Sequence, residues 1–145
     1  VPKYAEFVFE PLDRNFFSRA SSLRDQGFHN LIVAGLSYGQ GSSREHAAMC
    51  PMYLGVKGVI AKSIERIHAA NLVNFGIPGI RRSLEKGLDS VLAHAESSRK
   101  GEEGVGRKGE NKKEEELVLK MNLSRRQRMI LLAGGLLPFT VMSRK

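Results

Sequence analysis

The sequence of 145 residues predicts an α/β fold. Two short apolar runs rich in β-branched residues, at 31–35 and 56–61, are typical of buried strands. A helical pattern lies between these runs and another follows the second, and this alternation favours helices packed on a mainly parallel sheet. Because 41% of the residues are apolar, the chain is long enough for one core, and we expect a single domain over residues 1–145.

Upstream of the first apolar run, the pattern predicts a strand and then a helix. Residues 5–13, AEFVFEPLD, are expected to form a strand that enters a turn. Residues 14–27 are expected to form a helix that Gly27 closes, because glycine is favoured just past a helix C-terminus.

The helices expected after the two buried strands end in different ways. Residues 43–55 contain good helix formers, and Pro51 is expected to break this helix or to open a second short turn. Residues 63–76 should form a helix that ends on Gly76. The residues at helical spacing in this second segment are Ile64, Ile67, Asn71 and Phe75.

The second half of the chain has weaker signals. Residues 82–95 are weakly helical, whereas residues 98–116 mix both charge signs with glycine and hold almost nothing apolar. We expect a flexible charged loop at 98–113, because such a segment cannot bury enough apolar area to offset its conformational entropy. Residues 117–123 alternate like a strand, and residues 124–135 are typical of a capped helix that ends at a glycine pair.

Charge and cysteine content narrow the classes of function. The formal net charge is +8, and most of the excess lies in residues 81–145, with 15 basic against 9 acidic side chains. This charge favours an acidic ligand, an acidic protein surface or nucleic acid without choosing among them. The single cysteine, Cys50, excludes an internal disulfide and a cysteine-built metal cluster, so we expect a reducing, cytoplasmic location. No apolar run approaches the roughly 20 residues of a membrane helix.

The segment SYGQGSSREH, residues 37–46, lies between a buried strand and the start of a helix. Gly39, Gln40 and Gly41 allow a sharp turn whose N–H groups stay accessible. The N-terminus of the following helix adds unpaired donors with a partial positive charge. We therefore expect this loop to bind a carboxylate or a phosphate.

The side chains of the same loop suggest two roles for its serines. Arg44, expected in the first helical turn, offers a planar fork of donors suited to a carboxylate, and Ser42 and Ser43 would lie beside that anion. A serine acts as a proton-transfer base only if nearby donors stabilise its alkoxide. Alternatively, Ser42 and Glu45 form a capping box in which the serine only satisfies a backbone donor. His46 is more typical of a helix residue that meets the sheet than of a catalyst.

The stretch YGQGSSREHAA, followed by YLGVKGVIAKSIERIHAANLVNFGI, resembles the C-terminal swivel domain of the aconitase family. The similarity spans most of residues 4–80 and returns at residues 123–137, which are similar to the closing helix of the family. The resemblance implies a swivelling three-layer β/β/α domain. The DHI segment that usually opens this domain and a further substrate arginine upstream of the loop are not found, so we expect an N-terminally truncated domain.

The resemblance also implies a hydro-lyase activity. The family reversibly dehydrates and rehydrates a hydroxy-polycarboxylate, as in the isomerisation of citrate to isocitrate through cis-aconitate. By this likeness Ser42 would be the catalytic base, and Ser43 and Arg44 would bind a substrate carboxylate. The [4Fe-4S] cluster of the family is held by three cysteines in other domains or in a large subunit. We therefore expect this chain to bind no metal itself and to be inactive alone.

Two departures from the family pattern concern partnering and stability more than the site. Met52 stands where the family usually has arginine, and Ile64 where it commonly has an aromatic residue. The small subunit of isopropylmalate isomerase, or of homoaconitase, is an alternative identity, because it shares the serine–serine–arginine–glutamate core. Its loop usually begins with asparagine and phenylalanine, whereas this loop begins with Ser37 and Tyr38, which favours the aconitase form.

A non-catalytic RNA-binding module is the alternative from another class. The basic second half of the chain is the feature that suggests it. However, the basic run at 124–128 is more typical of the solvated face of an amphipathic helix, and the chain has no interleaved aromatic stacking platform. Nucleic acid is therefore not the expected partner.

Overall fold

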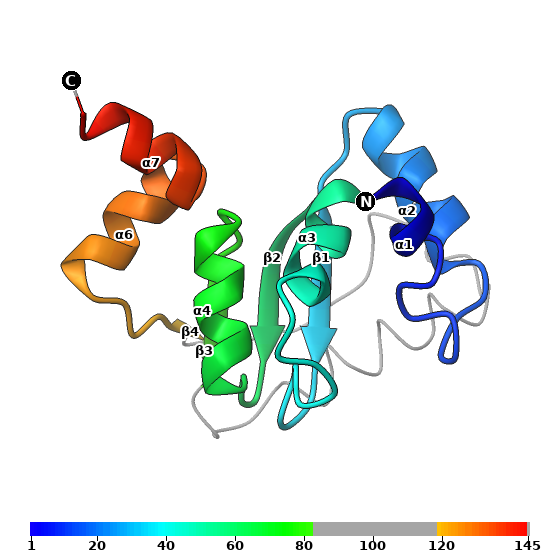
Figure 1. The fold of residues 1–145 in the computed structure, drawn as a ribbon. Coiled ribbons are helices and arrows are strands. Elements are labelled where there is room, and N and C mark those ends of the chain that lie inside the picture. The colour runs from blue at the N-terminus through cyan, green and yellow to red at the C-terminus, as the bar shows by residue number, and fades with distance from the viewer. Residues whose placement is uncertain (83–118, 145) are drawn as a thin grey trace, which may run out of the picture.

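The computed structural model describes residues 1–82 and 119–144, which contain one four-stranded sheet with helices packed against it (Figure 1). The strands lie in the order β1-β2-β3-β4. The first three are parallel, and β4 runs antiparallel to β3. Their bounds are β1 Asn30–Ala34, β2 Val56–Ala61, β3 Gly79–Arg82 and β4 Leu119–Lys120. The predicted α/β class is therefore confirmed, and these residues account for one β layer and its helices.

The helices form two groups around this sheet. Helices α3 and α4 contact each other, and they pack on β2 and β3 respectively, as crossover helices between neighbouring parallel strands do (Figure 1). Helices α1 and α2 lie beyond β1, and α6 and α7 lie beyond α4 at the opposite end (Figure 1). The bounds are α1 Pro2–Ala5, α2 Phe16–Asp25, α3 His46–Tyr53, α4 Arg66–Asn74, α6 Arg125–Leu132 and α7 Leu136–Met142.

Two clusters of buried apolar side chains hold these elements together. The main cluster lies between the sheet and its crossover helices, and the second joins α1 and α2 to α3, so that the N-terminal helices depend on α3 for burial. The main cluster consists of Ile32, Ala48, Val56, Val59, Ala61, Ile64, Leu72 and Ile77. The second consists of Ala5, Ala20, Cys50 and Leu54.

Several helix ends confirm the sequence predictions. Helix α2 is followed by Gly27 at φ +85° and α4 by Gly76 at φ +72°, a backbone region that glycine enters at little cost. Helix α6 has the predicted cap. Ser124 Oγ accepts from Gln127 N–H at 3.3 Å, while Gln127 Oε1 accepts from Ser124 N–H at 2.9 Å.

The prediction of a strand at 5–13 is wrong. Residues 2–5 form α1, and the turns that follow close local hydrogen bonds, such as those from Val8 N–H to Ala5 O (3.2 Å) and from Leu12 N–H to Phe9 O (2.8 Å). Backbone groups that are bonded within the segment are not free for a sheet ladder. Ala5 and Val8 of this segment pack with the second cluster and Phe9 with the main cluster, whereas Phe7 and Leu12 stay exposed.

The expectation that Pro51 breaks its helix is also wrong. Helix α3 continues through Pro51 to Tyr53, and Leu54 N–H still donates to Cys50 O at 3.1 Å. Because Cys50, Pro51 and Leu54 are all buried, their packing offsets the hydrogen bond that proline cannot donate.

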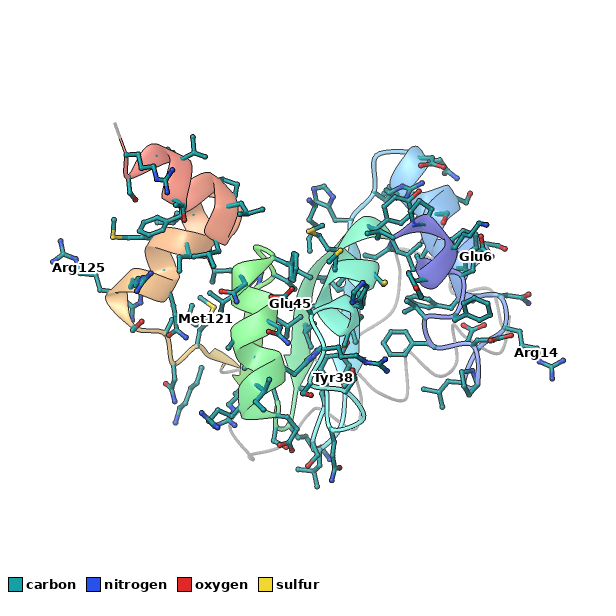
Figure 2. All side chains as sticks on the ribbon, viewed as in Figure 1. Glu6, Arg14, Tyr38, Glu45, Met121 and Arg125 are labelled. Atoms are coloured by element: carbon teal, nitrogen blue, oxygen red, sulfur yellow. The ribbon has the colours of Figure 1, made fainter. Side chains whose placement is uncertain are left out.

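The predictions for the second half are tested only in part. The weak helix at 82–95 and the flexible loop at 98–113 lie almost wholly or wholly outside the described residues. Of the strand expected at 117–123, the structure describes β4, while β3 and α7 were not anticipated. Arg125 points away from the body of the protein, which agrees with a solvated basic face on α6 (Figure 2). No helix within the described ranges is long and apolar enough to cross a membrane.

Removal of the α6 cap should lower stability measurably. We expect Ser124→Ala to reduce the free energy of unfolding by about 0.5–2 kcal/mol, because it leaves the N–H of Gln127 without its acceptor. Chemical denaturation of the full chain measures this change. Ser143→Ala, at the end of α7, is the matched control and should cost less, since no helix N-terminus depends on its hydroxyl.

Candidate functional site

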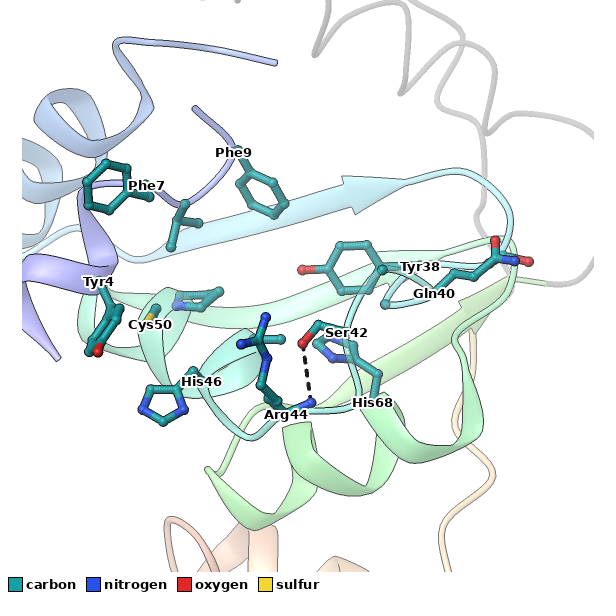
Figure 3. Close-up of a pocket in the computed structure, with 16 residues that line it drawn as sticks. Tyr4, Phe7, Phe9, Tyr38, Gln40, Ser42, Arg44, His46, Cys50 and His68 are labelled. Carbon is teal, nitrogen blue, oxygen red and sulfur yellow. Dashed lines mark hydrogen bonds between the residues drawn. The ribbon is translucent and has the colours of Figure 1, made fainter. Parts of the chain in front are cut away.

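A cavity of about 730 Å³ opens where β1 ends, at the carboxyl ends of the parallel strands (Figure 3). This edge is the usual ligand position in open parallel sheets. One wall is the loop that follows β1, with the side chains of Tyr38, Ser42 and Arg44. The opposite wall is mainly apolar and aromatic, comes from the N-terminal segment and α3, and also includes His46. That wall includes Tyr4, Phe7, Val8, Phe9, Ala47, Cys50 and Pro51.

The start of the loop is anchored to the segment that follows β2. Ser37 N–H donates to Ser63 Oγ at 2.7 Å, and Tyr38 N–H donates to Ser63 O at 3.0 Å. Glu65 N–H returns a bond to Tyr38 O at 2.9 Å, and Tyr38 pairs with Ile64 in a parallel bridge. These bonds add one parallel bridge beyond the end of the β1–β2 ladder, and they fix the direction in which the loop leaves the sheet.

Helix α4 supports the rest of the loop. The Nδ2 of buried Asn71 donates to Ser43 O at 3.1 Å. Gly39 lies against His68 so closely that a Cβ atom there would overlap Cβ and Cγ of His68 and lie 2.5 Å from its Cδ2. Gly39 also has φ +90°, so both its backbone angle and its surroundings require glycine. A Cβ atom added at Gly41 would meet no other atom within 4 Å. Of these two glycines, therefore, only Gly39 cannot be replaced by a larger residue without a clash.

The capping interpretation of Ser42 is wrong. Helix α3 begins at His46 with Glu45 as its N-cap residue, and Glu45 already has helical angles (φ −58°, ψ −31°). Ser42 Oγ accepts instead from Arg44 N–H at 3.2 Å, within the loop (Figure 3). Arg44 lies before the helix, which also corrects its expected place in the first turn. Ser42 therefore does not cap the helix, and it lies half-buried at the edge of the cavity.

The structure brings together some of the predicted site residues and separates one. Ser42 and Arg44 line the main cavity with the backbone of Gly39, Gln40 and Gly41, and the Arg44 side chain extends toward the cavity (Figure 3). Ser43 does not line it. Ser43 lines a second cavity of about 310 Å³ on the α4 side of the loop, with Glu65, Arg66 and Ile67.

Sequence reasoning missed two aromatic residues of the site, Tyr38 and His68. Their rings meet edge to face with centroids 5.0 Å apart. Burial raises the pKa of Tyr38 to about 12, so its phenol stays protonated and able to donate. Helical spacing could have identified His68, because it completes the buried series with Ile64 and Asn71, whereas Ile67 is half exposed.

Burial of His68 should make stability depend on pH. Desolvation lowers the pKa of His68 below its ordinary value of 6.5, so the folded chain holds this imidazole neutral. Below pH 6.5 the unfolded chain binds the proton and the folded chain does not, so stability falls as the pH falls. Denaturation midpoints above and below pH 6.5 should show this loss, and His68→Gln should reduce it. His46→Gln, at an exposed histidine, should leave it unchanged.

The described residues offer no grouping of three His, Cys, Asp or Glu side chains that could hold a metal ion. The sequence contains one cysteine, which is buried in α3, and burial raises the pKa of its thiol. An iron–sulfur cluster needs several thiolates, so the residues of this chain do not fit it as resident ligands.

Comparison with known proteins places the chain in a family. The family model of the aconitase C-terminal domain matches residues 10–85. The 3-isopropylmalate dehydratase small subunit of Sulfolobus acidocaldarius is 46% identical over 80 residues, covering 54% of this chain and 46% of the relative. Aconitate hydratase A of Rickettsia bellii is 46% identical over 66 residues, covering 46% of this chain and 8% of the relative. The chain thus spans about half the length of the small subunit it matches and far less of the aconitate hydratase.

A solved structure agrees with this assignment. The structure of 3-isopropylmalate dehydratase from Methanocaldococcus jannaschii aligns with a TM-score of 0.61 and 25% sequence identity, covering 97% of this chain and 78% of that one. The resemblance identified from the loop, the α/β fold and the family match over more than half of the residues agree. The chain belongs to the aconitase C-terminal domain family.

Proposed function

We propose that this chain supplies the swivel-domain part of a hydro-lyase active site, which reversibly dehydrates a hydroxy-polycarboxylate such as citrate. The observation that carries the proposal is the position of Ser42 and Arg44. A hydroxyl free of any helix cap and a guanidinium face one cavity at the carboxyl ends of the strands. The hydro-lyase names of the relatives support the reaction class.

In this reaction Ser42 removes the carbon-bound proton of the substrate. A serine alkoxide needs stabilisation, and the Arg44 N–H already lies 3.2 Å from Ser42 Oγ. The Arg44 guanidinium adds positive charge to the same wall and binds a substrate carboxylate through two parallel hydrogen bonds. The role of Ser43 in carboxylate binding stays a prediction, because Ser43 lines the second cavity and not the main one.

The remaining chemistry belongs to a partner. A [4Fe-4S] cluster supplies a Lewis acid for the leaving hydroxyl in this proposal, and cluster-bearing domains or a large subunit hold it. The relatives named as small subunits support such a partner. The contribution of this chain is to bind the carboxylate, orient the substrate carbon toward Ser42 Oγ and hold the proton that Ser42 takes.

An isopropylmalate substrate is the second candidate, and one feature of the cavity favours it. Apart from His46, the wall opposite Arg44 consists of apolar and aromatic side chains, among them Phe7 and Phe9, which suit an alkyl substituent better than a third carboxylate. The equal identity to both types of relative does not separate the two substrates. The loop residues Ser37 and Tyr38, by contrast, favour the aconitase form.

Reconstitution tests both candidates. The full chain is combined with the large subunit of a 3-isopropylmalate dehydratase or with the cluster-bearing domains of an aconitate hydratase, and formation of the unsaturated acid is followed by absorbance. We expect no turnover by the chain alone and turnover of citrate or isopropylmalate in one assembly. The absence of turnover of both acids in assemblies with an intact cluster would contradict the proposed function.

A further inference from the structure

Helix α4 carries the two buried polar side chains of the described core, and only one of them has a partner. His68 is 2% exposed and Asn71 is 8% exposed. Asn71 holds the Ser43 carbonyl, whereas neither ring nitrogen of His68 has a hydrogen-bond partner among the described residues. A buried polar group without a partner is costly and requires an explanation.

The position of His68 relates it to Ser42. Along the loop, Gly39 lies against the His68 side chain and Ser43 is bonded to Asn71, one turn further along α4. Ser42 lies between these two contacts. Ser42 and His68 also line both cavities, and the two side chains lie near each other at the main cavity (Figure 3).

His68 could supply the Ser42 oxygen with a second hydrogen-bond donor. Ser42 Oγ accepts from one described donor, the N–H of Arg44, and a second preorganised donor would stabilise its alkoxide further. Desolvation lowers the pKa of His68, so the ring is neutral and keeps a single N–H. A neutral imidazole can donate to an oxyanion without placing a second charge in the core.

We propose that a ring N–H of His68 donates a hydrogen bond to Ser42 Oγ, which makes His68 a positioning residue that completes a two-donor site for the serine oxygen. A small movement of the loop toward α4 forms this bond in solution, where it relieves the unpaired imidazole. Hydrogen bonds at reactive groups often tighten only in the working state. No proton leaves His68. The consequence for catalysis rests on the proposed function, whereas the bond itself does not.

The rival acceptor for the same N–H is Glu65. Its carboxylate lines the second cavity together with His68. The Ser43 carbonyl is already held by Asn71, so it competes less. The experiment must therefore show whether Ser42 or Glu65 accepts the hydrogen bond from His68.

Kinetics of the reconstituted enzyme with citrate or isopropylmalate test the catalytic consequence. His68→Leu removes the donor and should lower kcat by about 10²–10³, with little change in KM, because one donor to the developing oxyanion is lost. His68→Asn and His68→Gln each place an amide N–H near one ring nitrogen, and one of them should recover most of the loss. The rising limb of the pH–rate profile should move to higher pH in His68→Leu. His29→Leu, at an exposed histidine away from the cavity, should match the wild type.

Nuclear magnetic resonance of the ¹⁵N-labelled full chain tests the bond without any activity. Ser42→Ala should shift the side-chain N–H resonance of His68, while Glu65→Gln and the remote Ser18→Ala should leave it in place. An unchanged resonance in Ser42→Ala, or a shift in Glu65→Gln alone, would overturn the proposal. Wild-type kcat in a folded His68→Leu, or equal losses in the Leu, Asn and Gln variants, would overturn it as well. If wild-type assemblies prove inactive, the proposed function fails, and the resonance still decides whether the bond exists.

Discussion

Ser42→Ala is expected to lower kcat of the reconstituted enzyme by about 10²–10⁴, the usual effect of losing an acid–base group, with little change in KM. The exchange of the substrate's carbon-bound proton with solvent should cease. Because Ser42 does not cap α3, no helix cap is lost, and the free energy of unfolding should fall by no more than about 1–3 kcal/mol, the cost of leaving the buried His68 imidazole without the proposed bond. Proton exchange followed by nuclear magnetic resonance and chemical denaturation measure the two effects on one variant.

Arg44→Lys provides the contrast with Ser42→Ala. Lysine keeps the positive charge but loses the planar fork that binds a carboxylate through two bonds, so this variant should mainly raise KM. Wild-type proton exchange in Ser42→Ala would show that Ser42 is not the base. A combined loss of exchange and of folding would instead point to a structural role for its hydroxyl.

Gly39→Ala is expected to lower the free energy of unfolding by about 2–6 kcal/mol, the sum of a strain term and an overpacking term. A residue other than glycine at φ +90° is strained by about 1–3 kcal/mol. The added methyl group also overlaps Cβ and Cγ of His68, which are close to the α4 backbone and cannot move without it, and such overpacking costs about 1–3 kcal/mol. Chemical denaturation of the full chain measures the total.

Gly41→Ala is the matched control for this measurement. Gly41 belongs to the same loop, has no positive φ and would place its methyl group in open space. We expect its unfolding free energy to stay within about 1 kcal/mol of the wild type. Equal stability of both alanine variants would contradict the close packing of Gly39 on His68.

Much of the fold could be predicted because its signals are local. The apolar runs at 31–35 and 56–61 mark two neighbouring strands, since β-branched residues favour strands. The expected burial is correct for most of β2, whereas β1 buries only Ile32 and exposes Leu31. The cap at Ser124 is formed by residues three positions apart, so the sequence contains it in full. The loop residues Ser42 and Arg44 were found by the same kind of short-range pattern.

The errors arose where distant contacts decide the structure. The segment 5–13 has the composition of a strand, but it buries Ala5 against α3 and becomes helix and turns. Ser42 and Glu45 have the spacing of a capping box, yet the loop bonds to α4 delay the helix until His46. Helical spacing could mark His68 as buried, but its contact with the loop depends on Gly39, which lies 29 positions earlier in the chain.

The anchoring of the loop has a consequence for the order of folding. The long-range hydrogen bonds that anchor Ser37, Tyr38 and Ser43 come from Ser63, Glu65 and Asn71, which are separated from their partners by about 25 to 28 positions. Bringing residues so far apart into contact costs conformational entropy. The contacts that offset this cost form only when β2 and α4 are both in place. A nascent chain that has emerged only as far as α3 therefore contains Ser42 and Arg44 without the anchors of their loop. We expect the loop to take up its final geometry only when α4 docks on the sheet.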